Sequence, residues 1–269
     1  MKNFASKIVL ITGGGSGIGK IMSRLFLERE ARVVIWDISQ VNIDATLADL
    51  GSKGDITGYQ VDVSSPAQIS ASAKTLKQAV GGIDVLINNA GIVVGNKLFS
   101  EHTAGDIIKT MEVNSTAPML VAHEFLAGML AKNVGHICNI ASSGGLLGNP
   151  KMSVYAASKW SLVGWSDSLR IELQQSGKNV NVTTIMPYYI NTGMFDGVKS
   201  LIPILDAEAA CLTIVKAIEK NKVMVTLPGY VYRVTRFAQA ILPIRVFDWF
   251  TGSVLGIYKT MDGFTGRVK

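Results

Sequence analysis

The sequence has too few cysteines to suggest a disulfide-rich or a metal-binding protein. Among its 269 residues, only Cys138 and Cys211 are cysteines. Two cysteines do not make a disulfide framework, and their separation does not match the spacing of metal ligands. We therefore predict no metal site, and we expect both side chains to be small hydrophobic residues of the core.

A long hydrophobic run is also missing near the N-terminus. The apolar run from Ile8 to Ile11 leads directly into glycines. Such a run is far too short for the apolar part of a signal peptide or for a membrane span. It predicts a buried first strand instead, and the chain is expected to remain in the cytoplasm.

Charged residues are scarce and unevenly distributed. They make up 17% of the chain against 48% hydrophobic residues, which leaves ample material for a core and gives no sign of disorder. The net charge is +6, and residues 216–269 carry nine basic and three acidic side chains, whereas residues 1–215 carry 17 of each. A body with balanced charge excludes a nucleic-acid groove spread over the protein, so no nucleic-acid partner is expected.

The chain contains no linker rich in Pro, Gly or Ser and no internal repeat that would divide it into two domains. Short β-branched runs alternate with longer amphipathic segments, as right-handed βαβ units require. Strands are predicted over residues 7–12, 31–37, 56–63, 83–91, 134–142 and 179–187, and helices over residues 17–30, 40–50, 66–80, 103–131 and 152–176. This pattern predicts an α/β fold: a doubly wound, mainly parallel, Rossmann-type sheet with helices on both faces. We assign residues 1–228 to this single domain and residues 229–269 to a C-terminal helical extension.

A glycine-rich turn follows the first predicted strand and opens the first predicted helix. The glycines that define its pattern are Gly13, Gly17 and Gly19, which is a longer spacing than the strict G-x-G-x-x-G pattern. Glycines allow a diphosphate to approach the backbone closely, and the helix N-terminus supplies free N–H groups and the positive end of a dipole. Between a strand and a helix, the turn predicts a dinucleotide-binding site.

Asp37 ends the second predicted strand, eighteen residues after Gly19. This is close to the interval expected for the acid that accepts hydrogen bonds from the adenosine ribose. A carboxylate there would repel a 2′-phosphate, and no arginine or lysine stands beside it or in the glycine turn. The sequence therefore favours NAD over NADP. The alternative is an aspartate at a strand end that caps the helix after it.

Tyr155 and Lys159 are four residues apart in a predicted helix, within the segment VYAASKW. Residues at this separation are neighbours on one helix face. A cation near a phenol favours the phenolate and lowers a pKa that is normally about 10. The pair thus predicts a general base that works near neutral pH, although the same spacing also occurs in ordinary surface pairs.

These motifs together resemble those of a known enzyme family. The glycine turn, NNAG at 88–91, Asn114, Ser142 and the Tyr155–Lys159 pair occur in the order and at the intervals found in the classical short-chain dehydrogenases/reductases. The resemblance extends over residues 5–225. The segments NTGMF at 191–195 and LPGYVYRVTRFAQAILP at 227–243 further resemble the retinol dehydrogenase and 17β-hydroxysteroid dehydrogenase branch, which handles lipophilic alcohols.

The resemblance implies four catalytic residues. Tyr155 would be the general acid/base, and Lys159 would lower its pKa while holding the nicotinamide ribose. Ser142 would hydrogen-bond the substrate oxygen, with the adjacent Ser143 as its rival, and Asn114 would bind a water in a proton relay. In oxidation, a hydride would pass to NAD and the hydroxyl proton to Tyr155.

The resemblance also implies a set of cofactor-binding residues. Asp62 and Val63 would flank the adenine, Asn89 would lie on the adenosine side, and the residues after the sixth strand would hold the carboxamide end of the nicotinamide. The full set is Gly13, Ser16, Gly17, Ile18, Gly19, Asp37, Asp62, Val63, Asn89, Ala90, Gly91, Tyr155, Lys159, Pro187, Ile190 and Thr192. One position departs from the family pattern: Tyr188 replaces a usual glycine, and it is expected to fill space near the reacting carbon.

The residues expected around the substrate are apolar apart from Ser142. They are Leu146, Leu147, Met152, Tyr188, Met194, Phe195, Leu201 and Ile202. Residues 193–204 contain only Asp196 and Lys199 as charged side chains, so a small anionic substrate has no clamp. A hydrophobic secondary, long-chain, retinoid-like or steroid-like alcohol fits better. The alternatives are that these side chains only pack a lid, that the protein is an NADPH-type 3-ketoacyl-thioester reductase, or that it senses dinucleotides without catalysis.

The C-terminal segment 229–257 is apolar, carries Arg233, Arg236 and Arg245, and is interrupted by Pro243. A basic amphipathic helix can make peripheral contact with a membrane. It can equally be a lid or a subunit contact, with its apolar face buried, and this second alternative is the favoured expectation. The family resemblance also implies that residues 103–131 and 152–176 pair between subunits, which predicts a homodimer or homotetramer.

Overall fold

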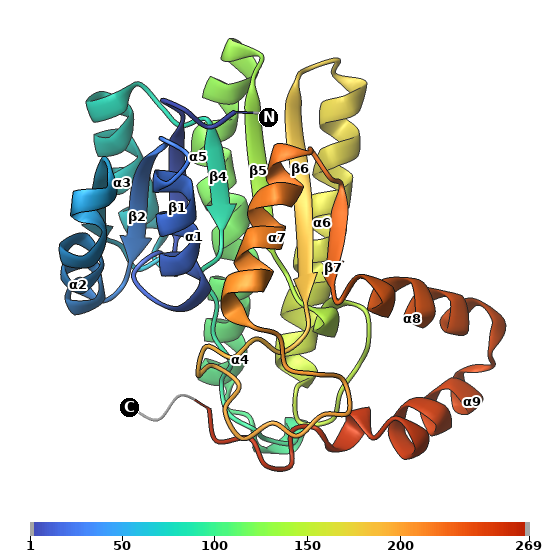
Figure 1. Cartoon of the computed structure of the whole chain (residues 1–269). Coiled ribbons are helices and arrows are strands. Elements are labelled where there is room, and N and C mark those ends of the chain that lie inside the picture. The colour runs from blue at the N-terminus through green and yellow to red at the C-terminus, as the bar shows by residue number, and fades with distance from the viewer. Residues whose placement is uncertain (1–2, 267–269) are drawn as a thin grey trace.

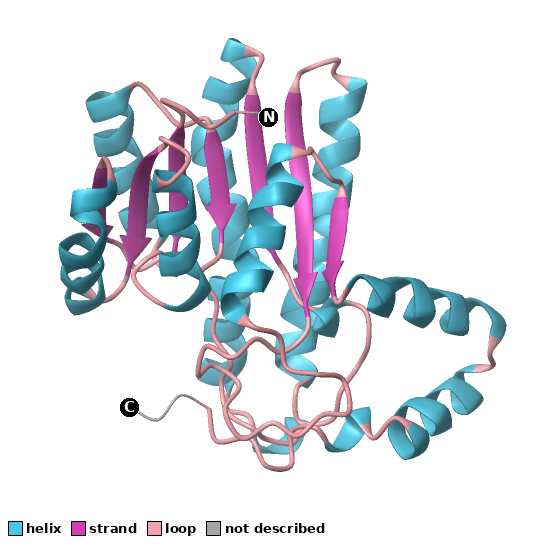
Figure 2. Cartoon of the chain, viewed as in Figure 1, coloured by secondary structure: helices cyan, strands magenta, loops and turns pink. Residues whose placement is uncertain are grey.

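The protein is built around one parallel sheet, seen in a computed structural model that describes residues 3–266. Within these residues, seven strands lie in the order β3-β2-β1-β4-β5-β6-β7. Figures 1 and 2 show the strands side by side, with their carboxyl ends at the same edge. The strands are β1 (Ile8–Thr12), β2 (Arg32–Asp37), β3 (Ile56–Gln60), β4 (Val85–Asn88), β5 (Gly135–Ile140), β6 (Val180–Pro187) and β7 (Met224–Leu227).

Helices cover both faces of the sheet, as expected for a doubly wound fold. One layer consists of α1 (Gly17–Leu27), α2 (Gln40–Leu50) and α7 (Ala207–Glu219), and the other of α3 (Pro66–Val80), α5 (Ala117–Lys132) and α6 (Ser153–Gln175). The first strand shows how one sequence supplies both cores. Val9 and Ile11 join the cluster under α1, whereas Leu10 joins the cluster under α5, because successive side chains of a strand point to opposite faces.

The predicted α/β architecture is confirmed, but the prediction omitted two elements. β7 has only four residues and lies at the edge of the sheet, so its apolar run is too brief to mark a strand. Helix α7 before it was also missed. The long helix predicted over 103–131 is divided into α4 (Ala104–Met111), a π-helical turn (Glu112–Thr116) and α5. Pro118 has no N–H to donate to the carbonyl four residues earlier, which favours such a break.

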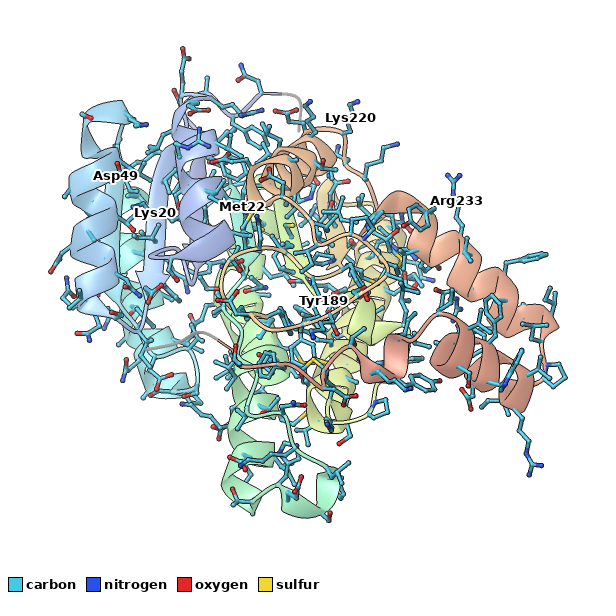
Figure 3. The ribbon with its side chains drawn as sticks, turned by 60° about the horizontal axis from the view of Figure 1, so that its bottom comes forward. Lys20, Met22, Asp49, Tyr189, Lys220 and Arg233 are labelled. Atoms are coloured by element: carbon cyan, nitrogen blue, oxygen red, sulfur yellow. The ribbon has the colours of Figure 1, made fainter. Side chains whose placement is uncertain are left out.

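The C-terminal extension forms two helices that project beyond β7, as Figures 1 and 3 show. They are α8 (Gly229–Ile241) and α9 (Ile244–Trp249), with Pro243 as the cap between them. Much of this hairpin is exposed in the single chain, because α8 contains no buried residue and Phe237 is 67% exposed. The physical reason for this exposure is that α8 packs beside β7 at the sheet edge and not over a face of the sheet. The expected lid or subunit contact stays a prediction. Within residues 3–266, no helix combines the length and the apolar character that crossing a bilayer requires.

The last described residues, 257–266, return from the hairpin to the loops at the carboxyl edge of the sheet; we call this stretch the C-terminal strap. Thr260 is buried, and its hydroxyl accepts hydrogen bonds from Asn149 Nδ2 at 3.0 Å and from the Tyr189 hydroxyl at 3.1 Å. The backbone N–H of Lys199 donates to the Thr260 carbonyl at 3.3 Å. The C-terminal strap therefore fastens two separate loops.

The buried His136 gives the fold a testable dependence on pH. Its Nε2 is 2.8 Å from the Thr183 hydroxyl, which donates to the Lys222 carbonyl, so the ring nitrogen is the donor. Burial lowers the pKa of His136 from 6.5 to about 3. Between these values the unfolded chain binds a proton that the folded chain does not, so stability falls as pH falls, by about 1.4 kcal/mol per pH unit from this group. The free energy of unfolding, measured with urea at pH 4–7, should change less with pH in His136→Gln than in the unmodified protein. The same substitution at the exposed His123 should leave this pH dependence unchanged.

Candidate active site

The glycine turn between β1 and α1 has the shape that a bound diphosphate needs. Gly13 and Gly17 have φ angles of +64° and +52°, in the left-handed region that favours glycine. A Cβ at Gly19 would collide with the carbonyl oxygen of Gly13, so the first turn of α1 can pack against the loop only with glycine there. The N-terminal N–H groups of α1 are thereby held beside the loop, which is the arrangement of an anion site.

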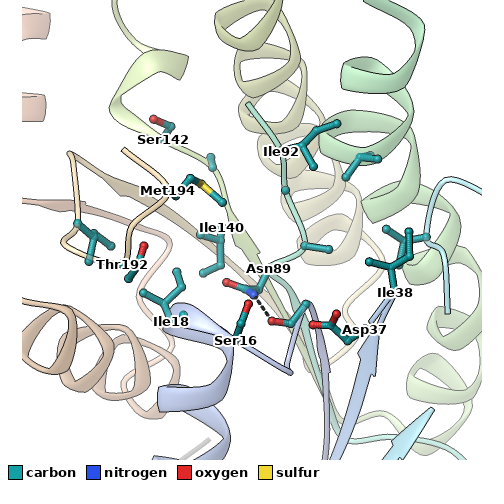
Figure 4. Close-up of a pocket in the computed structure, with 18 of the residues that line it drawn as sticks. Ser16, Ile18, Asp37, Ile38, Asn89, Ile92, Ile140, Ser142, Thr192 and Met194 are labelled. Atoms are coloured by element: carbon teal, nitrogen blue, oxygen red, sulfur yellow. Dashed lines mark hydrogen bonds between the residues drawn. The ribbon is translucent and has the colours of Figure 1, made fainter. Parts of the chain in front are cut away.

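Thr12 and Asn89 hold this turn in place across the two central strands. The Thr12 hydroxyl accepts hydrogen bonds from the backbone N–H groups of Asn89 and Ala90, at 3.0 and 3.1 Å. Asn89 Nδ2 donates to the carbonyls of Thr12 and Gly13, at 2.9 and 3.1 Å. Figure 4 shows Asn89 beside the turn. Its amide shapes the cleft by fixing the glycine backbone.

A cleft of about 330 Å³ runs along the carboxyl edge of the sheet. It contains every residue of the predicted cofactor set except Gly19, which is packed against the turn. Other residues line it that sequence reasoning missed: Trp36, Ile38, Asn42, Val61, Ile92, Lys109, Val113, Ile140 and Ala141. Several of these residues end a strand or follow it directly, and this position could have been used to predict them from the sequence. Lys109 has no such signal, because it comes from α4.

Asp37 is 7% exposed at the end of β2, where both of its carboxylate oxygens accept backbone hydrogen bonds. Oδ2 accepts from the N–H of Gly15 at 2.9 Å, and Oδ1 accepts from that of Ser39 at 3.0 Å. The alternative role as a helix cap is excluded, because Ser39 is the N-cap of α2. The two basic residues among the described lining, Lys109 and Lys159, belong to neither the glycine turn nor the residues after β2.

Asp62 lies at the end of the cleft expected to hold the adenine. Burial acts to raise the pKa of Asp62, but hydrogen bonds from Ser64 and the nearby Lys109 ammonium prevail and lower it. The Ser64 backbone N–H and hydroxyl donate to Asp62 Oδ1 at 2.9 and 2.6 Å, and Lys109 Nζ lies 3.4 Å from Oδ2. The carboxylate is therefore ionised and fixed in direction, and Lys109 ties this loop to α4.

The four predicted catalytic residues lie at the carboxyl edge of the sheet. Ser142 follows β5, Asn114 lies in the π-helical turn, and Tyr155 and Lys159 are in the first turns of α6. The Tyr155 hydroxyl is hydrogen-bonded to the side chain of Ser142. Lys159 Nζ donates to the Ile140 carbonyl at 2.9 Å and lies 5.8 Å from the centroid of the Tyr155 ring.

Burial controls the titration of the tyrosine–lysine pair. It raises the pKa of Tyr155 to about 12, against the hydrogen bond with Ser142, which acts to lower it. It also lowers the pKa of Lys159 to about 8. The expectation that the lysine charge lowers the tyrosine pKa below its usual value is thus wrong for this chain by itself. A tyrosine that keeps its proton at neutral pH is suited to donating that proton to a carbonyl oxygen.

Asn114 is completely buried and bonded to two neighbouring segments. Its Oδ1 accepts from the Ile92 N–H at 2.8 Å, and its Nδ2 donates to the Ile92 carbonyl at 2.9 Å and to the Ser158 hydroxyl at 3.1 Å. Both amide hydrogens are used by the protein, Oδ1 keeps a second lone pair, and the role as a water ligand stays a prediction. The side chain holds the loop after β4 against α6.

A second, apolar pocket of about 350 Å³ adjoins the cleft. The two cavities share Ser142, Tyr155, Tyr188 and Phe195 in their walls. Among the predicted substrate residues, Ser142, Leu146, Leu147, Met152, Tyr188, Phe195 and Ile202 line this pocket. Met194 lines the cofactor cleft instead, and Leu201 is 75% exposed. The loop turns sharply at Gly193 and Gly197, whose φ angles are positive, so its neighbouring side chains face different sides.

The C-terminal extension supplies a further wall of the apolar pocket. Sequence reasoning did not name these residues, which are Tyr230, Val231, Val234, Thr235, Phe250, Leu255 and Ile257. Gln239 Nε2 of α8 donates to the Leu146 carbonyl at 3.0 Å, which joins the extension to the loop after β5.

Tyr188 stands at the junction of the two cavities, and aromatic neighbours fix its position. Its hydroxyl is 2.7 Å from the Ser200 hydroxyl, and its ring packs edge-on against Tyr189 with centroids 4.5 Å apart. Phe195 continues the series, with its centroid 5.0 Å from that of Tyr189 and 6.1 Å from that of Tyr155. The position where the resembled family has glycine is therefore filled by a ring that both cavities contact.

Comparisons with known proteins agree with this geometry. The family model of the short chain dehydrogenases matches residues 7–201. Epidermal retinol dehydrogenase 2 of Mus musculus is 36% identical over 275 residues, covering 100% of this chain and 88% of that protein. Human 17-beta-hydroxysteroid dehydrogenase 13 is 34% identical, covering 91% of this chain and 82% of that protein.

A solved structure shares the architecture. The crystal structure of a short chain dehydrogenase/reductase from Burkholderia phymatum in complex with NAD superimposes with a TM-score of 0.82 at 25% identity, covering 89% of this chain and 95% of that one. The matched sequence family, the sheet order and the convergence of Ser142, Tyr155 and Lys159 lead to one conclusion. The chain belongs to the short-chain dehydrogenase/reductase family and is an NAD(P)-dependent alcohol dehydrogenase or carbonyl reductase.

Proposed function

We propose that this enzyme interconverts a hydrophobic alcohol and its carbonyl with NAD(H), and that Tyr155 is the acid/base. The observation that carries the proposal is the meeting of a dinucleotide-type cleft and an apolar pocket at Ser142 and Tyr155. The names of the relatives, a retinol dehydrogenase and a 17-beta-hydroxysteroid dehydrogenase, are consistent with a lipophilic secondary or long-chain, retinoid-like or steroid-like substrate.

The residues of the cleft fit a nicotinamide dinucleotide. The glycine turn and the N-terminus of α1 would hold its diphosphate, Asp37 its adenosine ribose, and Asp62 and Val63 its adenine. Gly91 lies between Asn114 and Lys159, where a Cβ would make ordinary contacts at 3.4 Å from Asn114 Oδ1 and 3.6 Å from Lys159 Nζ. When bound, the nicotinamide supplies or accepts the hydride at the substrate carbon.

The side chains of the protein would then handle the oxygen and the proton. Ser142 and Tyr155 orient the substrate oxygen between the two cavities. In reduction, Tyr155 donates its hydroxyl proton to that oxygen, and in oxidation it takes the proton back. Lys159 holds a positive charge beside the phenol, which stabilises the phenolate that forms in reduction. The apolar walls exclude water from this exchange.

Removal of the tyrosine hydroxyl tests the catalytic assignment. Tyr155→Phe should lower turnover by about 100- to 10,000-fold, because a positioned acid/base contributes about that much. The affinity for NAD, measured by quenching of protein fluorescence, should stay within a few fold. Tyr59→Phe is the control, since Tyr59 packs against the core and lines neither cavity. Near-normal kcat in Tyr155→Phe would show that another group is the base.

The lining of the apolar pocket supports a lipophilic substrate over an acyl thioester. Among its described lining residues there is no lysine or arginine that would bind the phosphate of a phosphopantetheine carrier. Retention of Ser142, Tyr155 and Lys159 together argues against a dinucleotide sensor without turnover. Because such alcohols partition into membranes, we place the protein in the cytoplasm with peripheral membrane contact.

Cofactor choice should follow Asp37. We expect kcat/KM for NAD to exceed that for NADP by roughly 10- to 100-fold, because a 2′-phosphate loses a charged hydrogen bond and meets a carboxylate. Asp37→Asn should narrow this ratio, whereas Asp44→Asn, at an exposed position of α2, should leave it unchanged. Thermal unfolding should be recorded alongside, because Asp37 also bonds to Gly15. Equal kcat/KM for the two cofactors in the unmodified enzyme would contradict the proposal.

We also propose a homodimer or homotetramer that pairs α4, α5 and α6 between subunits. Exposed apolar side chains occur on these helices, including Ile108 at 57%, Trp160 at 48% and Ile171 at 42%. Light scattering at micromolar concentration should give at least twice the chain mass. Trp160→Glu should shift the protein toward monomer, because a buried unpaired charge is costly. Val41→Glu, on α2 at 76% exposure, should not shift it. A monomeric unmodified protein would contradict this assembly.

A further inference from the structure

We infer that the α8–α9 hairpin docks on an anionic lipid surface, and that the apolar pocket opens toward that surface. The docking is argued from the residues of the hairpin and does not depend on the proposed function. The consequence for substrate entry rests on the proposed function, because it requires a lipophilic alcohol.

The first observation is an apolar face that the fold leaves uncovered. We call Phe237, Ile241, Ile244 and Trp249 the outer stripe; they are 67%, 59%, 75% and 62% exposed. Along α8, Tyr230, Val234, Phe237 and Ile241 follow one another at intervals of three or four residues, which places them on one side of the helix. An apolar face of this size on projecting helices marks an interaction surface.

The second observation is that this face continues into the apolar pocket. Tyr230 and Val234 line the pocket, although they are 55% and 59% exposed. Phe250 and Leu255, after α9, do the same at 40% and 37% exposure. An apolar path therefore leads from the outer stripe to the pocket that contains Ser142 and Tyr155. A lipophilic molecule could follow it without being transferred through water.

The third observation is the charge of the hairpin. Arg233, Arg236 and Arg245 make no described ion pair within residues 3–266, and Figure 3 shows Arg233 pointing away from the body. The one carboxylate in residues 229–257 is that of Asp248, which accepts a hydrogen bond from the Tyr258 hydroxyl at 2.8 Å. Exposed arginines flanking an apolar face are complementary to anionic headgroups above acyl chains.

The same charge disfavours a second copy of the chain as the occupant. In a twofold symmetric contact the same patch meets itself, so the arginines of one hairpin would be brought close to those of the other. Anionic lipid instead satisfies the apolar stripe and the cations together.

Sedimentation with vesicles tests the docking without any substrate. The intact protein should co-sediment with phosphatidylcholine vesicles that contain phosphatidylserine, bind pure phosphatidylcholine much less, and be released as salt approaches 1 M, where screening extends only about 3 Å. Replacing the three arginines by glutamine should weaken binding about 100-fold, at about fivefold for each arginine. Lys53, Lys74 and Lys178, all exposed on the body, provide the matched triple glutamine control.

The outer stripe has its own variant and control. Serine at Phe237, Ile241, Ile244 and Trp249 should lower vesicle binding at least tenfold, whereas Val41→Ser with Val223→Ser, at 76% and 44% exposure and outside α4, α5 and α6, should not. If the unmodified protein fails to bind anionic vesicles at low salt, the docking is wrong. A second outcome would also contradict the docking: the unmodified protein does not bind vesicles, and the serine variant loses self-association in light scattering. In that case a second copy of the chain covers the apolar face.

Kinetics separate the docking of the hairpin from substrate delivery, by which we mean entry of a lipophilic alcohol into the apolar pocket from the lipid surface. For a long-chain alcohol embedded in anionic vesicles, the outer-stripe variant should show a KM at least tenfold higher than the unmodified enzyme, with an unchanged KM for a short soluble alcohol. Equal KM values for the embedded alcohol would overturn delivery. If vesicles bind but no alcohol or ketone of either kind is turned over, the proposed function fails and the docking stands.

Discussion

The reversal of strand order between β1 and β4 is the constraint on which both cavities depend. The chain winds outward from β1 toward β3 on one side, then returns to β4 and winds toward β7 on the other. The loops after β1 and β4 therefore diverge to opposite faces and leave a crevice at the carboxyl edge. Thr12 and Asn89 bridge the base of that crevice through four hydrogen bonds, which keep the glycine turn at a fixed distance from β4.

Burial at the junction of the two cavities works against charge on either member of the catalytic pair. The pKa of Tyr155 rises to about 12 and that of Lys159 falls to about 8, so burial favours the neutral form of each group. A change of one in a pKa corresponds to about 1.4 kcal/mol between the charged and the neutral form. Near neutral pH the stability cost comes from Lys159, which stays charged despite its burial, and not from Tyr155, which is neutral in the folded and the unfolded chain. A charge that develops in such an apolar site during the reaction is felt strongly. Apolar neighbours such as Met152 and Met261 maintain that environment.

Features that depend on short stretches of chain could be predicted from the sequence. The glycine turn, Asp37 and the Tyr155–Lys159 pair are defined by local spacing, and the alternation of apolar runs predicted six strands and the doubly wound fold. Contacts between distant segments could not be predicted. Helical spacing does not reveal that the Asn114 amide is used by Ile92 and Ser158. The apolar pattern of α8 looks the same whether its stripe is buried or exposed, and only the position beside β7 decides.

The C-terminal strap has a consequence for the order in which the protein becomes functional during synthesis. A ribosome releases the chain from its N-terminus, and folding units form in that order. The segments that form the cofactor cleft, from β1 to the loop after β6, are all made before the strap. The loops of Asn149, Tyr189 and Lys199 cannot be fastened until Thr260 has emerged. The loops at the carboxyl edge are therefore all made before they can be fastened, and a chain that stops short of Thr260 would lack the fastening of those loops.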